Sequence, residues 1–350
     1  MNKFKLYFTA ISLVFVLFSC NSEDDVEPVP IREYSVQYAT DISTIESYLK
    51  TYYIEQIINH PGFSDDQDIK FTKIPTGGTQ ASIWTLLEDP ENPSTAYPKL
   101  LIKNVSLHDI VYKIYYLKLR ADNLTGKSPS RVDYVLTSYA GSYLANTSVT
   151  TGSVTTVEVT STSFQTIIFP ENPIPLFGAI RGWGEIIPLF KTGTYDPTSG
   201  SGPAAFTDFG AGVMFLPSGL GYFYEPQVGI PAYSPLVFSI KLYDMVKADQ
   251  DGDGIFSDDE DLNRNGIFTD DDTDGDGKQD YLDMDDDADG YLTRTEITKP
   301  TATAGPSSTY PYDPIFNADP LLNELAGVPN CAGETISPTR LRKYLDPSCH

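Results

Sequence analysis

Basic side chains are scarce in this 350-residue chain. It carries 24 Lys and Arg residues against 48 Asp and Glu residues, and its formal net charge at pH 7 is -24. A protein that binds nucleic acid needs Lys and Arg to neutralise phosphates in quantity. The composition therefore argues against nucleic acid as a partner.

Histidine is scarcer still, with only three in the whole chain: His60, His108 and His350. None of them stands in a recognisable Ser/His/Asp arrangement or at zinc-ligand spacing. Conventional nucleophilic or zinc catalysis is therefore poorly supported.

The apolar run at the N-terminus, from Leu6 to Phe18, is too short for a comfortable membrane span. Two lysines precede it and Ser19-Cys20 follows it, the pattern of a signal peptide. Its end resembles a bacterial lipobox, in which Cys20 is lipidated and becomes the new N-terminus. The alternative is an ordinary signal peptide cut near Ser19. The acidic stretch 21–25 resembles signals that send some lipoproteins to the cell surface.

Cysteine is nearly absent, and without Cys20 only Cys331 and Cys349 remain. Two cysteines in an exported chain favour a disulfide between them. The closed loop of about 18 residues would stabilise the fold by roughly 3 kcal/mol in the chain-entropy model.

Residue patterns predict many strands and few helices. Ser43 with Glu46 forms a capping-box pattern for a helix over Ser43–Tyr53, and a second helix opens near Trp183 and ends by Gly193. Ser/Thr-rich residues 147–162 and Gly/Pro-rich residues 195–210 are predicted as insertions, the second a surface loop. Alternating or short apolar runs predict strands over Asp68–Lys73, Lys99–Val105, Tyr112–Arg120, Val132–Gly141, Val213–Leu216 and Leu236–Leu242.

One ordered set of residues resembles FKBP-type peptidyl-prolyl cis-trans isomerases, best over residues 126–246. The sequence departs from that family at Gln165, where aspartate usually follows the phenylalanine matched by Phe164, and at Phe223, which replaces a glycine. The matching residues are, in order, Tyr139, Gly141, Ile180, Gly182, Trp183, Gly193, Pro217, Ser218, Leu220, Tyr222, Ile230, Pro231, Leu236, Phe238 and Leu242.

The resemblance implies an α+β fold, with a twisted antiparallel sheet wrapped around one short helix and interrupted by the insertions. It also implies a proline pocket with Trp183 as its floor. The Tyr222 hydroxyl and the Ile180 backbone N–H would hold substrate carbonyls. The apolar walls would be Tyr139, Phe164, Ile180, Ile230 and Phe238. Without the resemblance, aromatic residues in a β domain are core residues more often than site residues.

Residues 249–296 hold 19 acidic side chains and 3 basic ones. Oxygen-bearing residues recur there at positions 1, 3, 5, 9 and 12 of calcium loops, with glycine at position 6. Position 7 of the two complete loops, Ile255 and Tyr291, would offer a backbone carbonyl. The other predicted ligands are Asp249, Asp251, Asp253, Ser257, Glu260, Asp261, Asn263, Asn265, Thr269, Asp272, Asp274, Asp276, Asp280, Asp283, Asp285, Asp287, Asp289, Thr293 and Glu296.

The loops begin too close together for flanking helices, so the region resembles thrombospondin type 3 or dockerin modules. The alternative is a solvated acidic tail. The predicted order along the chain is a signal peptide (1–19), a tether with a helix (20–60), an FKBP-like domain (61–246), calcium repeats (247–299), and a linker with a Cys-bounded tail (300–350).

We therefore expect an outer-membrane lipoprotein of the cell envelope that isomerises proline-containing exported chains and is rigidified by calcium. Two alternatives are a module that grips proline peptides without turnover and a calcium-dependent surface spacer or adhesion element.

Overall fold

The structure is a computed structural model, and it describes residues 30–58, 67–197, 205–300 and 305–349. The chain divides into two units, Met1–Glu33 and Tyr34–His350. The predicted signal peptide and Cys20 lie outside the described residues. None of the described helices combines the length and the apolar character needed to cross a bilayer.

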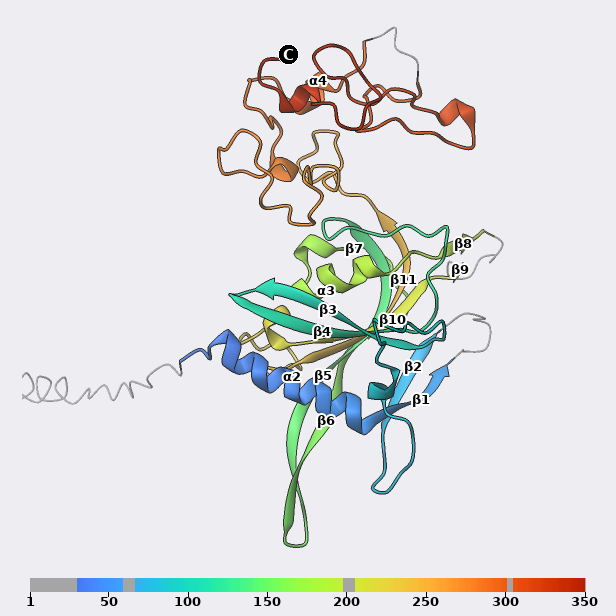
Figure 1. The fold of residues 1–350 in the computed structure, drawn as a ribbon, viewed down its shortest axis with the longest axis vertical. Coiled ribbons are helices and arrows are strands. Elements are labelled where there is room, and N and C mark those ends of the chain that lie inside the picture. Colours follow the sequence, from blue (N-terminus) through green and yellow to red (C-terminus); the bar gives the residue numbers. More distant parts are fainter. Residues whose placement is uncertain (1–29, 59–66, 198–204, 301–304, 350) are drawn as a thin grey trace, which may run out of the picture. The chain divides into compact units, whose positions relative to one another are not determined.

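A curled, antiparallel seven-stranded sheet forms the centre of the second unit (Figure 1). This arrangement confirms the prediction of an α+β fold built from an antiparallel sheet with few helices. The strands lie in the order β3 (Lys99–Leu107), β4 (Ile110–Lys118), β10 (Gly210–Leu216), β11 (Leu236–Val246), β5 (Tyr134–Thr151) and β6 (Val154–Ile167), and β7 (Ile174–Pro175) also pairs with β5.

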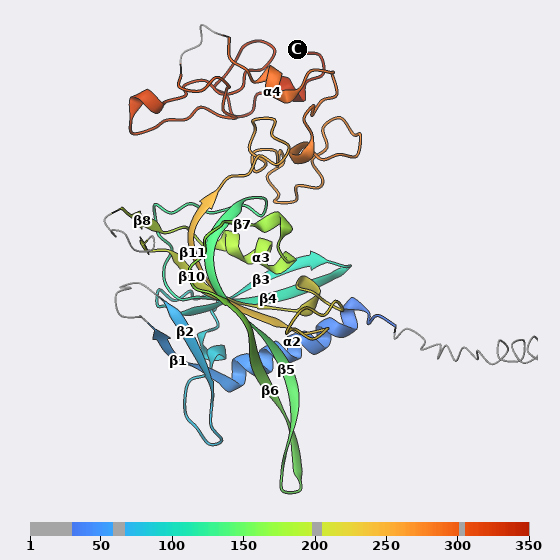
Figure 2. The ribbon, with the colours of Figure 1, turned by 180° about the vertical axis from the view of Figure 1, so that it is seen from behind.

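The sheet buries both of its faces. Successive residues of a strand point to opposite faces. In β10, Met214 and Leu216 accordingly join the cluster that contains α3 (Arg181–Ile186), whereas Val213 and Phe215 join the cluster that contains α2 (Tyr34–Thr51). Both views show the two helices on either side of the strands (Figures 1 and 2). Every residue of β10 is therefore buried.

Helix α2 differs from its prediction, because it begins at Tyr34 and not after a cap at Ser43. Two polar side chains, Gln37 and Asp41, lie on its buried face, where a pattern of apolar residues does not reveal them. The chain leaves α2 directly into β1 (Tyr52–Ile58), which pairs with β2 (Asp68–Lys73).

Strands β5 and β6 form a long hairpin that extends past their neighbours (Figure 2). The predicted insertion over residues 147–162 is its distal half, and its turn contains Gly152 at φ +63°. The predicted loop over 195–210 contains most of a small hairpin of β8 (Thr194–Asp196) and β9 (Ala205–Thr207).

Helix α3 is shorter than predicted, and a 3-10 turn, Ile187–Leu189, follows it. Pro188 lacks the N–H that a continuing helix would need. Gly182 lets α3 approach the sheet closely, since a Cβ there would stand 2.6 Å from the Leu216 side chain.

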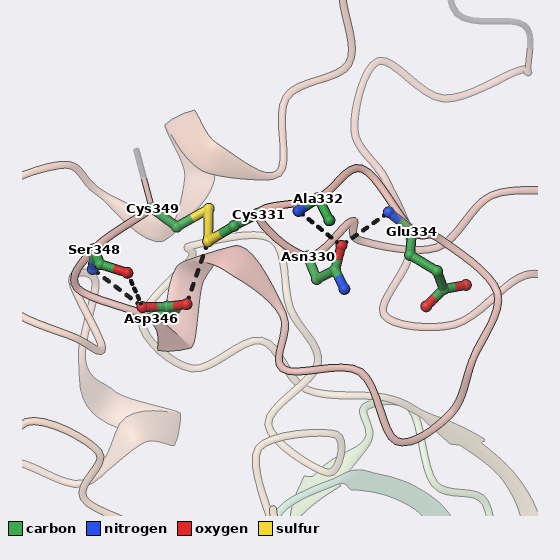
Figure 3. The surroundings of a disulfide bond; sticks show 7 residues. All are labelled: Asn330, Cys331, Ala332, Glu334, Asp346, Ser348 and Cys349. Carbon is green, nitrogen blue, oxygen red and sulfur yellow. Dashed lines mark hydrogen bonds between the residues drawn. A yellow bond between two sulfur atoms is a disulfide. The ribbon is translucent and has the colours of Figure 1, made fainter.

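The acidic region contains turns and the one-turn helix α4 (Thr293–Glu296). The tail packs back onto it, and its residues Val328 and Tyr344 share a buried cluster with Ile255 and Ile297. A disulfide joins Cys331 and Cys349 (Figure 3). The turns beside it are closed by Asn330, which accepts from two backbone N–H groups, and by Asp346, which accepts from Ser348.

Candidate functional site

Four aromatic rings meet edge to face on the α3 side of the sheet. The Trp183 ring lies 5.1 Å from Tyr139 and 5.3 Å from Phe238, measured between centroids, and both pairs are nearly perpendicular. Phe164 lies 5.7 Å from Phe238. Edge-to-face pairs at these distances are favourable beyond simple burial. We call these four residues the ring wall.

A β-bulge brings Phe164 into the ring wall. Gly141 pairs with Gln165 and Ser142 with Ser163, which leaves Phe164 as the extra residue on β6. Bulges commonly re-aim a side chain. Gly141 makes room for the rings, because a Cβ there would stand 2.5 Å from Phe164 and 2.9 Å from Phe238.

Trp183, a member of the ring wall, lies on the first turn of α3. Its side chain is 5% exposed, and its indole N–H has no hydrogen-bond partner in the part of the chain that the structure describes. Ile180 precedes the helix, and its carbonyl accepts from the Trp183 backbone N–H. The Ile180 N–H itself makes no hydrogen bond to any described residue.

Tyr222 and Ile230 complete the apolar cluster around the ring wall. Burial raises the pKa of Tyr139, and the nearby Tyr222 raises it further. The Tyr222 hydroxyl makes no hydrogen bond within the described ranges. All seven residues predicted for the proline pocket therefore lie in or against one cluster. A hollow of about 400 Å³ at the β3–β4 turn, over residues 106–111, is lined by none of them.

The turn that carries Tyr222 is fastened to helix α2. The backbone N–H and the hydroxyl of Ser218 donate to the Asp41 carboxylate at 2.7 and 2.6 Å. Gln37 donates to the other oxygen of Asp41 at 2.6 Å. Sequence reasoning missed this contact, because Asp41 and Ser218 are far apart in the chain and neither belongs to an acid–base motif.

Phe223 adopts φ +49°, in the left-handed region that favours glycine. In this chain the Phe223 ring is buried and stacks on Tyr34 of α2 at 4.1 Å. The packing of the ring offsets the strain of the backbone.

Four acidic loops form a second candidate site, and one hydrogen-bond pattern recurs in each. The glycine at position 6 has positive φ and donates its N–H to the carboxylate at position 1, as Gly254 does to Asp249 and Gly290 to Asp285, both at 3.2 Å. The N–H groups at positions 5 and 7 donate to the side chains at positions 3 and 5. The turns thereby gather the position 1, 3 and 5 side chains.

In each of three loops, three carboxylates bring one oxygen each to within 4.8 Å of one another. This is the spacing that one cation needs. The second loop has only one carboxylate at these positions, Asp261, beside the amides of Asn263 and Asn265. The gathered triplets are Asp249, Asp251 and Asp253; Asp272, Asp274 and Asp276; and Asp285, Asp287 and Asp289.

Several of these carboxylates are buried with oxygens that lack a hydrogen-bond partner among the described residues. Both oxygens of Glu260 and of Glu296, at position 12 of the complete loops, are in this state, and the two side chains are 1% and 3% exposed. A buried anion is costly unless a cation or hydrogen bonds compensate it. The donor set fits a hard cation with oxygen ligands.

The carboxylates also oppose one another's ionisation. Burial, with Asp251 and Asp249 nearby, raises the pKa of Asp253 to about 8. Burial and the carboxylates of Asp287 and Asp289 raise the pKa of Glu296 to about 8. A fourth group joins Asp253 and Glu260 to Asp286. Sequence reasoning left Asp286 out of the ligand set, because it stands at position 2 of its loop.

Comparison with known proteins gives partial similarities. Residues 250–323 match a family model described as BamM C-terminal. No curated protein sequence matches the chain.

Three solved structures align with parts of it. A peptidyl-prolyl cis-trans isomerase from Pseudomonas syringae is 19% identical over 42% of this chain and 81% of its own, with a TM-score of 0.28. FkpA from Escherichia coli is 22% identical over 38% of this chain and 47% of its own, with a TM-score of 0.25. The structure of the three FKBP domains of wheat FKBP73 is 12% identical over 43% of this chain and 52% of its own, also with a TM-score of 0.25. These TM-scores are low, and the ring wall and acidic loops carry the functional inference.

Proposed function

We propose that this chain is a peptidyl-prolyl cis-trans isomerase whose active site is the ring wall with Tyr222, Ile180 and Ile230. The convergence of all seven predicted residues in one cluster carries the proposal. Its substrates would be proline-containing segments of exported polypeptides.

Isomerisation requires neither a nucleophile nor a metal. Twisting the peptide bond breaks amide resonance, against a barrier of roughly 18–20 kcal/mol. The twisted carbonyl is less dipolar than the planar one, so an apolar wall favours the transition state over the ground state. Interactions that are stronger in the transition state are the ones that accelerate the reaction.

Three donors without partners in the described chain lie around the cluster: the Tyr222 hydroxyl, the Ile180 N–H and the indole N–H of Trp183. The first two would hold substrate carbonyls, while Trp183 would lie under the proline ring. A bound peptide would satisfy donors that the fold leaves open. Binding energy from these contacts would be used to orient the twisted amide.

Two variants test this assignment. Trp183→Ala should abolish proline-peptide binding, and Tyr222→Phe should lower the turnover rate while leaving the fold intact. Isomerisation of a proline tetrapeptide is measured without a coupling protease, and circular dichroism reports the fold. Wild-type turnover by both variants would remove the ring wall as the active site.

A second candidate function is binding of proline segments without turnover. Gln165 is exposed on β6, and none of the seven predicted pocket residues carries a carboxylate, whereas the resembling family has an aspartate at the position of Gln165. Peptide affinity without rate acceleration would favour this candidate.

We also propose that the acidic loops bind calcium as a structural ion. The open oxygens, the positive-φ glycines and the repeated turns support this proposal. Calcium accepts six to eight oxygen ligands, and extracellular sites function with weak affinity. Calorimetric titration with calcium tests it, and an absence of binding at millimolar calcium would leave a merely acidic region.

Attachment to the outer membrane through Cys20 is the remaining part of the proposal, and it rests on the leader sequence. Cys20→Ser should abolish labelling by palmitate and shift the protein to the soluble fraction. Unchanged labelling would exclude Cys20 as the anchor.

A further inference from the structure

The first and fourth acidic loops approach each other through three buried carboxylates. Asp253 and Glu260 belong to the first loop, and Asp286 belongs to the fourth. Each of the three side chains is 1% exposed. One carboxylate oxygen from each residue lies within 4.8 Å of the other two. We propose that these three residues hold one calcium ion that the two loops share, an inference that rests on the proposed calcium binding of the loops.

The open oxygens of this group support a bound cation. Both oxygens of Glu260, one of Asp253 and one of Asp286 are buried without a hydrogen-bond partner among the described residues. No Lys, Arg or His in the described ranges forms an ion pair with any of them. Two oxygens that each bind one calcium ion at about 2.4 Å lie at most about 4.8 Å apart. The spacing of the three oxygens, within 4.8 Å, meets that limit.

Asp286 is held in place for this role. Its second oxygen accepts from the Thr293 hydroxyl at 2.6 Å, and Thr293 is fully buried. The other oxygen, Oδ1, is buried without a hydrogen-bond partner among the described residues. Asp286 belongs to the fourth loop in the sequence and lies beside ligand residues of the first loop.

Further contacts join the same two loops. Arg294 of the fourth loop donates to the Gly252 carbonyl of the first at 3.2 Å. A Cβ on Gly254 would stand 2.8 Å from the side chain of Ile297, the residue that follows the fourth loop. The backbone of the first loop therefore lies in close contact with that side chain. A shared ion would couple the folding of the two loops, because the free energy of binding that ion would stabilise the folded conformation of both loops.

The test compares Asp286→Asn with a matched control, Asp258→Asn, in the full chain. Asp258 stands outside the predicted ligand positions and pairs with Lys247 at 3.1 Å. In calorimetric titration with calcium, Asp286→Asn should weaken one ion at least tenfold or remove it, and the control should keep wild-type stoichiometry and affinity. In metal-free buffer the effect on stability should be the opposite, and Asp286→Asn should resist proteolysis more than wild type, because a neutral amide replaces a buried carboxyl whose ionisation opposes folding.

A second variant, Glu260→Gln, keeps the inference testable if one substitution disturbs folding. Because Asp286 and Glu260 would hold the same ion and Glu260 also belongs to the first loop, the double variant should lose no more calcium than Glu260→Gln alone. Wild-type calcium binding by Asp286→Asn, or additive losses in the double variant, would overturn the shared site. A wild-type chain that binds no calcium would instead remove the proposed calcium function itself.

Discussion

Gly141 has no side chain, and two aromatic rings fill the space that a methyl group would take. Gly141→Ala should displace Phe164 or Phe238 and destabilise the fold by about 1–3 kcal/mol, as overpacking commonly does. Proline-peptide turnover should fall with it, because the ring wall would open. Gly178→Ala is the matched control, since its Cβ would meet only Pro175 at 3.7 Å. Equal turnover in the two variants would contradict the role of the ring wall.

The buried carboxylates make the metal-free loops sensitive to pH. Burial raises the pKa of Asp253 from 3.8 to about 8 and, with Asp253 among its neighbours, that of Asp286 to about 9. A carboxyl whose pKa is raised in the folded state binds more protons there than in the unfolded state. The contribution of these two carboxyls to the free energy of unfolding should therefore be fully present below about pH 4 and should be lost as the pH rises toward 8–9.

Thermal unfolding of metal-free protein at several pH values, followed by the signal of buried tyrosines such as Tyr344, checks this expectation. Excess calcium should flatten the pH dependence above neutrality, since the cation replaces the protons. An unfolding temperature of the metal-free loops that rises between pH 5 and 8 would contradict it.

Single residues show where sequence reasoning succeeds. Trp183, Tyr222 and Phe238 could be found because their order in the chain resembles a known pattern. Two features could not be found from the sequence. The bulge that turns Phe164 inward depends on how β6 pairs with β5, and the position of Asp286 beside the first loop depends on residues that are distant in the sequence.

At the scale of elements, helix α2 supports the site from the far face of the sheet through Asp41. Asp41→Ala would leave the buried Ser218 N–H unpaired, and we expect a loss of about 1–3 kcal/mol in the free energy of unfolding. Turnover should fall as well, because the turn that carries Tyr222 loses its fastening.

Glu46→Ala is the control for this effect on the same helix. It removes a carboxylate that accepts from the Tyr115 hydroxyl at 2.8 Å, away from the Ser218 turn. We expect denaturant unfolding to show a loss in both variants and kinetics to show a loss only in Asp41→Ala. If Asp41→Ala and Glu46→Ala lowered turnover equally, α2 would only stabilise the fold and would not position the Tyr222 turn.

Strands β2, β3, β4, β10 and β11 were predictable to within a few residues, since short or alternating apolar runs mark their buried faces. Strand β1 was not predicted, and β5 continues ten residues beyond its predicted end. The start of α2 was not predictable, because Gln37 and Asp41 satisfy each other and Ser218 inside the core. The long β5–β6 hairpin was predicted as an insertion, because its Ser/Thr-rich strands are exposed at the distal end and carry no apolar alternation.

At the scale of the whole molecule, the sheet and the acidic loops should respond differently to loss of calcium. The sheet has apolar clusters on both faces, whereas the loops share only a small one with the tail. Chelation should therefore make residues 249–296 sensitive to protease and loosen the tail residues that pack on Ile255. The fragment that ends near residue 246 should survive.

Mass spectrometry of the fragments, with and without millimolar calcium, identifies the cut sites, and added calcium should restore protection. Identical digestion in both conditions would mean that no metal orders the loops.

The central claim is that the ring wall turns proline peptides over, and exchange NMR of a proline tetrapeptide tests it most directly. A substoichiometric amount of the wild-type chain should speed cis–trans exchange of the peptide, and Tyr222→Phe should slow that catalysed exchange. Removal of calcium should leave the acceleration unchanged, since the sheet folds around its own core. Exchange at the uncatalysed rate in the presence of folded, peptide-binding protein would contradict the claim.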